Sequence, residues 1–200
     1  MPEMIMERRT WNGSVRARWP VTVLELSPAR ACWVTLPDAS RTHPRDGTIE
    51  QVDHLEFSVC ARQFWHATAV VAADGRVLGH RVEVATPVDG RGTGRLAHVA
   101  LDVEVTVAGA RLHHDWPRRL AERMLARGYP PALVDQGLRG VRDAARRVRD
   151  RLWPFDGWLD AQAARAQRRL VPPDRRAARP PWEAVRGVAA LPAAASRSAA

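Results

Sequence analysis

The sequence has 200 residues and a formal charge of +9 at pH 7, with 31 basic and 22 acidic residues. All of the basic residues are arginine, and Ala, Val and Gly are abundant, a composition typical of a GC-rich genome. The charge is therefore weak support for nucleic-acid binding in particular, although anionic partners such as nucleotides or RNA are compatible with it.

Cysteine content and hydropathy exclude several other classes of protein. Cys32 and Cys60 are too few for a disulfide framework and have no metal-binding spacing, so we expect two small buried side chains in a reducing compartment. The N-terminus has no run that resembles a signal peptide, and the chain has no stretch of about 18 apolar residues. We therefore expect a cytoplasmic protein with no membrane partner.

Short apolar or alternating runs, separated by turn residues, fill the first half of the chain. Asn12-Gly13 and Asp74-Gly75 are hairpin signals, and the polar residues 37–47 are expected to form a loop. The expected strands are residues 15–19, 21–26, 31–36, 49–52, 55–61, 64–71 and 76–84. Such a series predicts a closed antiparallel barrel or a sandwich.

The stretch Leu96–Arg119 combines a strand with the acidic residues that point to a metal. Alternate residues from Val99 to Val107 are apolar, as in a half-buried strand, and Ala108-Gly109 turns the chain back. This hairpin would bring Asp102 near Asp115, and paired carboxylates suit a hard divalent cation. Alternatively, Asp102 lies on a solvated strand face and Asp115 caps a helix.

Helical patterns follow to residue 170. We expect helices over Pro117–Arg127, from Pro131 to about Leu152, and over Trp158–Leu170. The second has apolar residues every three or four positions and should pack on the strands, with its charged face in solvent: these are Val134, Leu138, Val141, Ala145, Val148 and Leu152. Pro, Ala and Arg dominate after Val171, so we expect one domain over residues 1–171 and a disordered tail over residues 172–200.

Several motifs in this order carry a family resemblance: Gly79-His80-Arg81-Val82-Glu83-Val84-Ala85-Thr86-Pro87, His98-Val99-Ala100-Leu101-Asp102-Val103, Asp115, Gly128-Tyr129-Pro130-Pro131 and Trp153-Pro154-Phe155. They are similar to the FomD-like barrel family, whose pattern has a Tyr-Val-Asn-Leu-x-x-Pro strand, an Asp-x-Asp-x-Asp strand and an acidic helix start. The resemblance covers about residues 10–160. It implies an α+β fold, an antiparallel β-barrel followed by two or three C-terminal α-helices packed on it.

The resemblance also implies divalent-metal-dependent hydrolysis of nucleotide phosphoanhydrides, with Mg²⁺ or Mn²⁺ as cofactor. Of six family ligand positions, Asp102 and Asp115 keep their acids, and Glu83 and His98 could still ligate a metal, with His98 alternatively a catalytic base. Ala100 and Arg118 stand at the other two positions. The metal site is therefore expected to be degenerate, and a histidine ligand favours a softer ion than Mg²⁺.

Arginines are the expected phosphate ligands, because a guanidinium can donate two hydrogen bonds at once. The family has an arginine in the first hairpin where this chain has Ala17, so the flanking Arg16 and Arg18 are candidates if the register shifts. Arg91 and Arg95 lie in a Gly-rich connection that is not a P-loop, and Arg118 lies at a helix start.

Two functions from different classes follow. The first is a metal-dependent nucleotide phosphohydrolase, in which arginines neutralise the charge on the leaving phosphate. The alternative is a non-catalytic member of the same fold that binds a nucleotide or RNA without metal. A structural domain that assembles through its helices or tail is the third interpretation.

Overall fold

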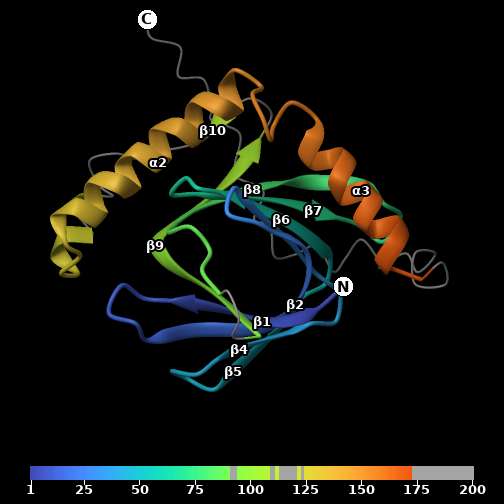
Figure 1. The fold of residues 1–200 in the computed structure, drawn as a ribbon, viewed down its shortest axis with the longest axis horizontal. Coiled ribbons are helices and arrows are strands. Elements are labelled where there is room, and N and C mark those ends of the chain that lie inside the picture. The colour runs from blue at the N-terminus through green and yellow to red at the C-terminus, as the bar shows by residue number, and fades with distance from the viewer. Residues whose placement is uncertain (91–93, 109–110, 113–120, 123, 173–200) are drawn as a thin grey trace, which may run out of the picture.

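The computed structural model describes residues 1–90, 94–108, 111–112, 121–122 and 124–172, and it forms a β-barrel with helices across one side (Figure 1). The strands are β1 Glu3–Arg9, β2 Val15–Leu26, β3 Arg30–Thr35, β4 Ser40–His43, β5 Thr48–Gln51, β6 Leu55–Ala61, β7 His66–Val71, β8 Val77–Ala85, β9 Arg95–Ala108 and β10 Arg111–Leu112. Residues 121–122 and 124–126 are helical, and α2 Pro131–Arg149 and α3 Trp158–Leu170 follow.

Seven of the described strands close the barrel in the order β1-β9-β8-β7-β6-β3-β2, with β1 paired to β2. The α+β architecture is confirmed, but the barrel is mixed, because β1 and β9 run parallel. Alternation of side chains cannot reveal this, since parallel and antiparallel strands have the same period. A parallel pair needs a long connection between its strands, and here the connection is most of the barrel.

The turn signals are confirmed, and one expected loop is wrong. Gly13 and Gly75 both adopt the positive φ that tight hairpin turns require. Residues 37–47, however, contain β4, which pairs with β5 and touches β2 through Arg18 and Thr42. This short polar edge strand has no apolar alternation, so its sequence looks like a loop.

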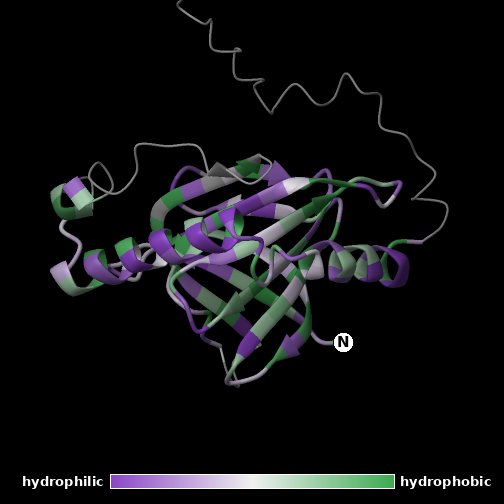
Figure 2. Cartoon of the chain, turned by 90° about the horizontal axis from the view of Figure 1, so that it is seen from above, coloured by the Kyte–Doolittle hydropathy of each residue, from purple (hydrophilic) through white to green (hydrophobic). Residues whose placement is uncertain are grey.

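The outer face of β6, β7 and β8 carries the main apolar core, which α2 and α3 cover. Leu55, Phe57 and Trp65 are almost fully buried there, together with Ala144 and Leu159 from the two helices. Seen from above, each helix shows both hydrophilic and hydrophobic residues along its length (Figure 2). Cys32 and Cys60 are buried free thiols, as expected.

The apolar stripe of α2 is confirmed only in part. Val134, Val141 and Val148 are buried, but Leu152 lies beyond the helix and is 40% exposed. Small residues extend the buried face, and Gly140 approaches the backbone of Phe64 closely. The described helices contain no segment both long enough and apolar enough to cross a membrane.

Candidate functional site

A polar pocket of about 90 Å³ opens inside the barrel. Its lining comes from inward-facing positions on the barrel strands and from the β4–β5 hairpin: Arg8, Ala17, Trp19, Trp33, Thr35, Arg41, His43, Glu50, Glu56, Ser58, His66, Thr68, Arg81, Glu83, His98 and Glu104. Alternate residues of a strand face the same side, so one face of each strand contributes to a shared interior. Barrel interiors usually hold apolar side chains, and this concentration of charge marks a site.

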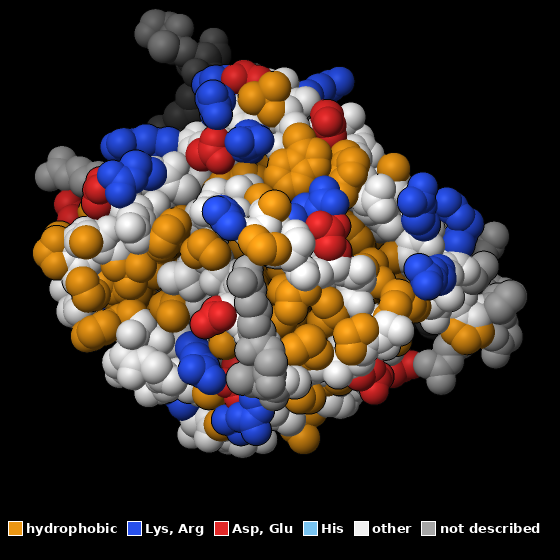
Figure 3. All heavy atoms as spheres, in the orientation of Figure 1, with side chains coloured by type: hydrophobic (Ala, Val, Ile, Leu, Met, Phe, Trp, Pro, Cys, Tyr) orange, Lys and Arg blue, Asp and Glu red, His pale blue; other side chains and the backbone are white. Residues whose placement is uncertain are grey.

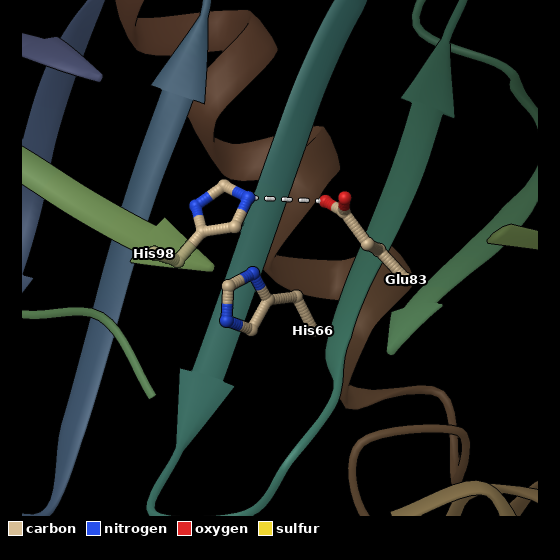
Figure 4. Close-up of side chains that lie close together, drawn as sticks. All are labelled: His66, Glu83 and His98. Atoms are coloured by element: carbon tan, nitrogen blue, oxygen red, sulfur yellow. Dashed lines mark ion pairs between the residues drawn. The ribbon is translucent and has the colours of Figure 1, made fainter. Parts of the chain in front are cut away.

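His66, Glu83 and His98 all line this pocket, and their side chains lie close together (Figure 4). His66 of β7 lies directly opposite Glu83 of β8, and His98 lies in β9. One nitrogen or oxygen atom from each residue lies within 4.8 Å of the others. Among the described residues, this is the cluster of His, Cys, Asp and Glu that could hold a metal ion.

Glu83 is an ionised carboxylate held between a cation and a histidine. Arg8 Nε lies 2.7 Å from Glu83 Oε1, and His98 Nε2 lies 3.3 Å from Glu83 Oε2. Burial alone raises the pKa of Glu83, but His98, Arg8 and His66 outweigh it and hold the pKa far below its ordinary value. The group is therefore available as an anionic ligand.

The two histidine rings are nearly enclosed, with 2% of His66 and 3% of His98 exposed. His66 Nε2 lies 2.9 Å from the carbonyl oxygen of Thr86 and donates to it. His66 Nδ1 and His98 Nδ1 have no hydrogen-bond partner among the described residues, whereas His98 Nε2 lies beside Glu83 Oε2. Buried polar atoms are rarely left without partners, and unpaired nitrogens of this kind suit a metal that is not part of the chain.

A network of arginines and glutamates lines the rest of the pocket. Glu56 pairs with Arg41 and, at 2.5 Å, with Arg81. Arg81 Nη1 also lies 3.5 Å from Glu104 Oε1, and Arg8 Nη2 lies 3.9 Å from Glu104 Oε2. Burial lowers the pKa of Arg81, but Glu56 and Glu104 together raise it above its ordinary value. Arg81 therefore remains charged, and each of the three arginines has a carboxylate partner.

No model of a known family matches the sequence, and no curated protein does. Two solved structures share the architecture. FomD in complex with CDP aligns with a TM-score of 0.65 and 14% identity, over 78% of this chain and 89% of that one. The phosphatase SC4828 with the non-hydrolyzable nucleotide GPCP aligns with a TM-score of 0.64 and 17% identity, over 78% of this chain and 86% of that one. The chain has the FomD-like barrel fold.

The FomD-like barrel brings together two of the metal ligands expected from the sequence, Glu83 and His98. Asp102 lies in β9, but its side chain lies outside the described part of the chain, and so does all of Asp115. Ala100 is fully buried and carries no ligand atom. Arg91 and Arg118 also lie outside the described residues.

The remaining predicted arginines do not line the polar pocket. Arg18 and Arg95 both pair with Glu7, whose side chain is 1% exposed, at 3.0 Å and 3.4 Å. These groups border a separate cavity of about 340 Å³ beside β4. Arg16 is half-buried and is not part of either lining. The register of β2 instead directs Ala17 into the polar pocket.

Several residues of the site were missed from the sequence, and Arg8 and His66 show why. Arg8 is paired across the first hairpin with Ala17, so it presents a guanidinium beside the position that lacks one. A register shift between Arg8 and Arg9 hides this pairing from residue counting. His66 lies in an apolar run, where a lone histidine resembles a packed core residue. Its proximity to Glu83 depends on the pairing of β7 with β8, which a register shift between Val70 and Val71 hides from residue counting.

Proposed function

We propose that this chain is a divalent-metal-dependent phosphohydrolase that acts on the phosphoanhydride bonds of nucleotides, in the polar pocket of the barrel. The observation that carries the proposal is a buried His–Glu–His cluster beside three arginines, in a fold shared with CDP-bound FomD and with the phosphatase SC4828. A site for nucleotide phosphates needs cationic groups and a polar, largely enclosed cavity.

The charge of the pocket explains why an ion is needed. Three arginines and four glutamates line it, so its side chains carry a net charge of −1 when the histidines are neutral. A polyphosphate is repelled by such a surface, whereas a bound divalent cation changes the balance to +1. We therefore expect the ion and the nucleotide to bind together more tightly than either binds alone.

Glu83, His98 and His66 are the described residues that would hold the ion, and the orphaned ring nitrogens fit that task. When bound, a divalent ion polarises the phosphoryl oxygens and makes an attacking water more acidic. Asp102 and Asp115 remain proposed additional ligands from the carboxylate pattern of the sequence. Arg91, Arg95 and Arg118 remain proposed phosphate ligands from the arginine pattern of the sequence.

Arg8 and Arg81 are the guanidinium groups that we propose to bind the phosphates. Each is paired with carboxylates, and a planar fork can exchange one oxygen pair for another without losing its hydrogen bonds. Their charge would stabilise the negative charge that develops on the leaving phosphate oxygen. The pocket thus supplies both ion ligands and charge neutralisation from its own strands.

The test is phosphate release from a panel of nucleoside di- and triphosphates, with Mg²⁺, Mn²⁺, Zn²⁺ or a chelator. Wild type is compared with Glu83→Gln and with a matched control, Glu25→Gln, whose ion pair with Arg30 lies outside the pocket. We expect metal-dependent release that falls by about 100-fold or more in Glu83→Gln and is unchanged in Glu25→Gln. No release with any ion would refute hydrolysis. Nucleotide binding without metal would then favour the non-catalytic alternative, with nucleotide or RNA as the ligand.

A further inference from the structure

The proposed function leaves open which class of ion the donor atoms of the His66, Glu83 and His98 cluster prefer. Two imidazole nitrogens and one carboxylate oxygen face one another, drawn from three neighbouring strands (Figure 4). Mg²⁺ prefers oxygen ligands and usually keeps several waters, whereas imidazole suits Zn²⁺ and related first-row transition ions. The donor atoms therefore indicate which class of ion the cluster prefers.

We propose that His66 Nδ1, His98 Nε2 and Glu83 Oε2 form a transition-metal site that selects Zn²⁺ or a similar ion over Mg²⁺. The proposal deepens the proposed function, on which its catalytic meaning rests, by naming the class of ion. It also makes His66 a metal ligand, a role that the carboxylate pattern of the sequence does not assign to any residue of β7.

The tautomer of His66 is set by the backbone. A carbonyl oxygen can only accept, so the 2.9 Å contact to Thr86 places the proton of His66 on Nε2 and leaves a lone pair on Nδ1. Nδ1 is turned toward His98 and Glu83 (Figure 4). Metal-ligating histidines commonly use a backbone carbonyl in this way to fix the ring orientation.

Thr86 is itself held rigidly against the strand that carries His98. Its backbone N–H donates to the Val99 carbonyl at 3.0 Å, and its hydroxyl accepts from the Val99 N–H at 2.9 Å. One residue therefore fixes the acceptor for His66 and the backbone beside His98. A site whose supporting groups are locked loses little entropy when an ion binds.

One donor spacing matches that of a small tetrahedral site. His98 Nε2 and Glu83 Oε2 are 3.3 Å apart. Metal–ligand bonds of about 2.0 to 2.1 Å at tetrahedral angles separate two ligands by roughly that distance. Arg8 contacts the other oxygen, Oε1, at 2.7 Å, which leaves Oε2 for the ion. Three protein ligands leave a coordination position open for substrate.

The decisive measurement is calorimetric titration of the metal-free, full-length protein with Zn²⁺, Co²⁺ and Mg²⁺, in the absence of nucleotide. We expect one Zn²⁺ or Co²⁺ per chain, with an affinity at least about 100-fold above that of Mg²⁺. Bound Co²⁺ should give visible d–d absorption bands typical of low coordination number. Metal binding and phosphate release are separate readouts, so loss of hydrolysis with retained Zn²⁺ binding would contradict only the proposed function.

His66→Gln should weaken Zn²⁺ and Co²⁺ binding by about 100-fold or more and change the Co²⁺ spectrum, because one ligand is removed. The matched control is His54→Gln, a histidine in the turn before β6 that does not line the pocket, and its affinity should equal that of wild type. Equal effects of the two substitutions, or Mg²⁺ binding as tight as Zn²⁺, would overturn the proposal.

A buried histidine can be needed for folding, so one measurement uses the unmodified chain. Long-range proton–nitrogen NMR of the wild type should show His66 as the Nε2–H tautomer without metal. Zn²⁺ should shift the Nδ1 resonance of His66 and the Nε2 resonance of His98. A proton on Nδ1 of His66, or ring resonances unmoved at saturating Zn²⁺, would exclude these ligands.

Discussion

Arg8 is the residue whose environment joins the two halves of the site. Its guanidinium contacts Glu83, one of the candidate metal ligands, and lines the pocket that we assign to the nucleotide phosphates. Arg9, the next residue, faces the other side of β1 and pairs with Glu7. Neighbouring residues of one strand therefore provide a test position and its control.

Arg8→Gln should lower kcat/KM for nucleotide hydrolysis by about 10- to 100-fold, which corresponds to one charge-assisted hydrogen bond of about 1.5 to 3 kcal/mol. Zn²⁺ affinity should not fall, because a positive charge has been removed from beside the site. Steady-state kinetics and calorimetry measure the two effects, and Arg9→Gln should leave both unchanged. A parallel loss of metal affinity in Arg8→Gln would mean that the arginine only supports the cluster.

Two of the three residues of the described cluster, Glu83 and His98, were candidate ligands in the sequence. They lie on the adjacent strands β8 and β9, and period two together with the family resemblance is enough to give their inward direction. His66 and Arg8 could not be found in this way, because their roles depend on pairing between strands. Arg8 faces Ala17 through a bulged hairpin, and His66 faces Glu83 across β7 and β8. Register is a tertiary property wherever turns do not fix it.

At the scale of elements, α2 reaches the barrel through two glycines whose surroundings differ. A Cβ on Gly140 would lie 2.6 Å from the carbonyl oxygen of Phe64, a backbone atom that cannot move without disturbing the start of β7. A Cβ on Gly137 would meet the side-chain tips of Leu101 at 3.0 Å and Met124 at 3.6 Å. Flexible side chains can yield by the few tenths of an ångström that are needed.

Gly140→Ala should therefore reduce the free energy of unfolding by about 1 to 3 kcal/mol, although alanine favours a helix. Gly137→Ala should stay within about 1 kcal/mol of wild type, since the propensity gain offsets the crowding. Urea denaturation followed by circular dichroism measures both. Equal stability of the two variants would show that α2 can move away from Phe64 without cost.

A second link between α2 and the barrel is electrostatic. Asp143 Oδ2 accepts from the indole N–H of Trp65 at 3.0 Å and from Arg147 at 2.9 Å. Burial raises the pKa of Asp143, but hydrogen bonds from Arg147, Trp65 and Arg146 outweigh it and lower the pKa below the ordinary value of 3.8. The unfolded chain therefore takes up this proton at a higher pH than the folded chain does.

Asp143 should stabilise the fold fully above its unfolded pKa, and this stabilisation should be lost as the pH falls through the lower folded pKa. Asp143→Asn should reduce the free energy of unfolding by about 1 kcal/mol near pH 7, and by less near pH 3. Urea titrations at both pH values measure the difference in free energy of unfolding between wild type and variant. Asp135→Asn, which removes an exposed pair with Arg139, should change stability little at either pH. If this difference were the same at both pH values, the predicted link between protonation of Asp143 and stability would be contradicted.

The helices and most strands were predictable because their periods are local. Trp158–Leu170 is α3 within the expected bounds, and Leu55–Ala61 is β6. The parallel β1–β9 pair and β4 were not predictable, because strand order and edge pairing leave no periodic signal in a polar segment. Whether the tail after residue 171 is disordered stays a prediction, since residues 173–200 lie outside the described part of the chain.

At the scale of the whole molecule, the described residues on the face in Figure 3 show positive charge that is distributed rather than concentrated. Arginine side chains are scattered around the face shown in Figure 3, with acidic groups beside several of them. On α2, arginines pair with neighbouring acids, as Arg139 does with Asp135 and Arg149 with Asp150. A nucleic-acid surface usually gathers unpaired cations along one face. The pattern favours a small anionic ligand in the pocket over a long polyanion on the surface.

The charge of the polar pocket leads to a prediction about how ion binding and nucleotide binding affect each other. Because the pocket carries a net −1 without an ion, a non-hydrolysable nucleoside diphosphate should raise Tm little in the presence of chelator. With saturating Zn²⁺ the same nucleotide should raise Tm by several degrees, since a ligand that binds only the folded state stabilises it by mass action. Differential scanning fluorimetry measures all four combinations of ion and nucleotide.

The two functional classes differ in whether ion binding and nucleotide binding are coupled. A metal-dependent hydrolase should show a combined Tm shift larger than the sum of the separate shifts, and Glu83→Gln should abolish that excess. A chain kept for metal-independent binding should respond to the nucleotide equally in chelator, and its response should weaken as salt rises. In that case removal of Glu83 would increase nucleotide affinity, because a negative charge would have left the pocket. The direction of the Glu83→Gln effect on nucleotide binding therefore separates the two functions even where turnover is too slow to detect.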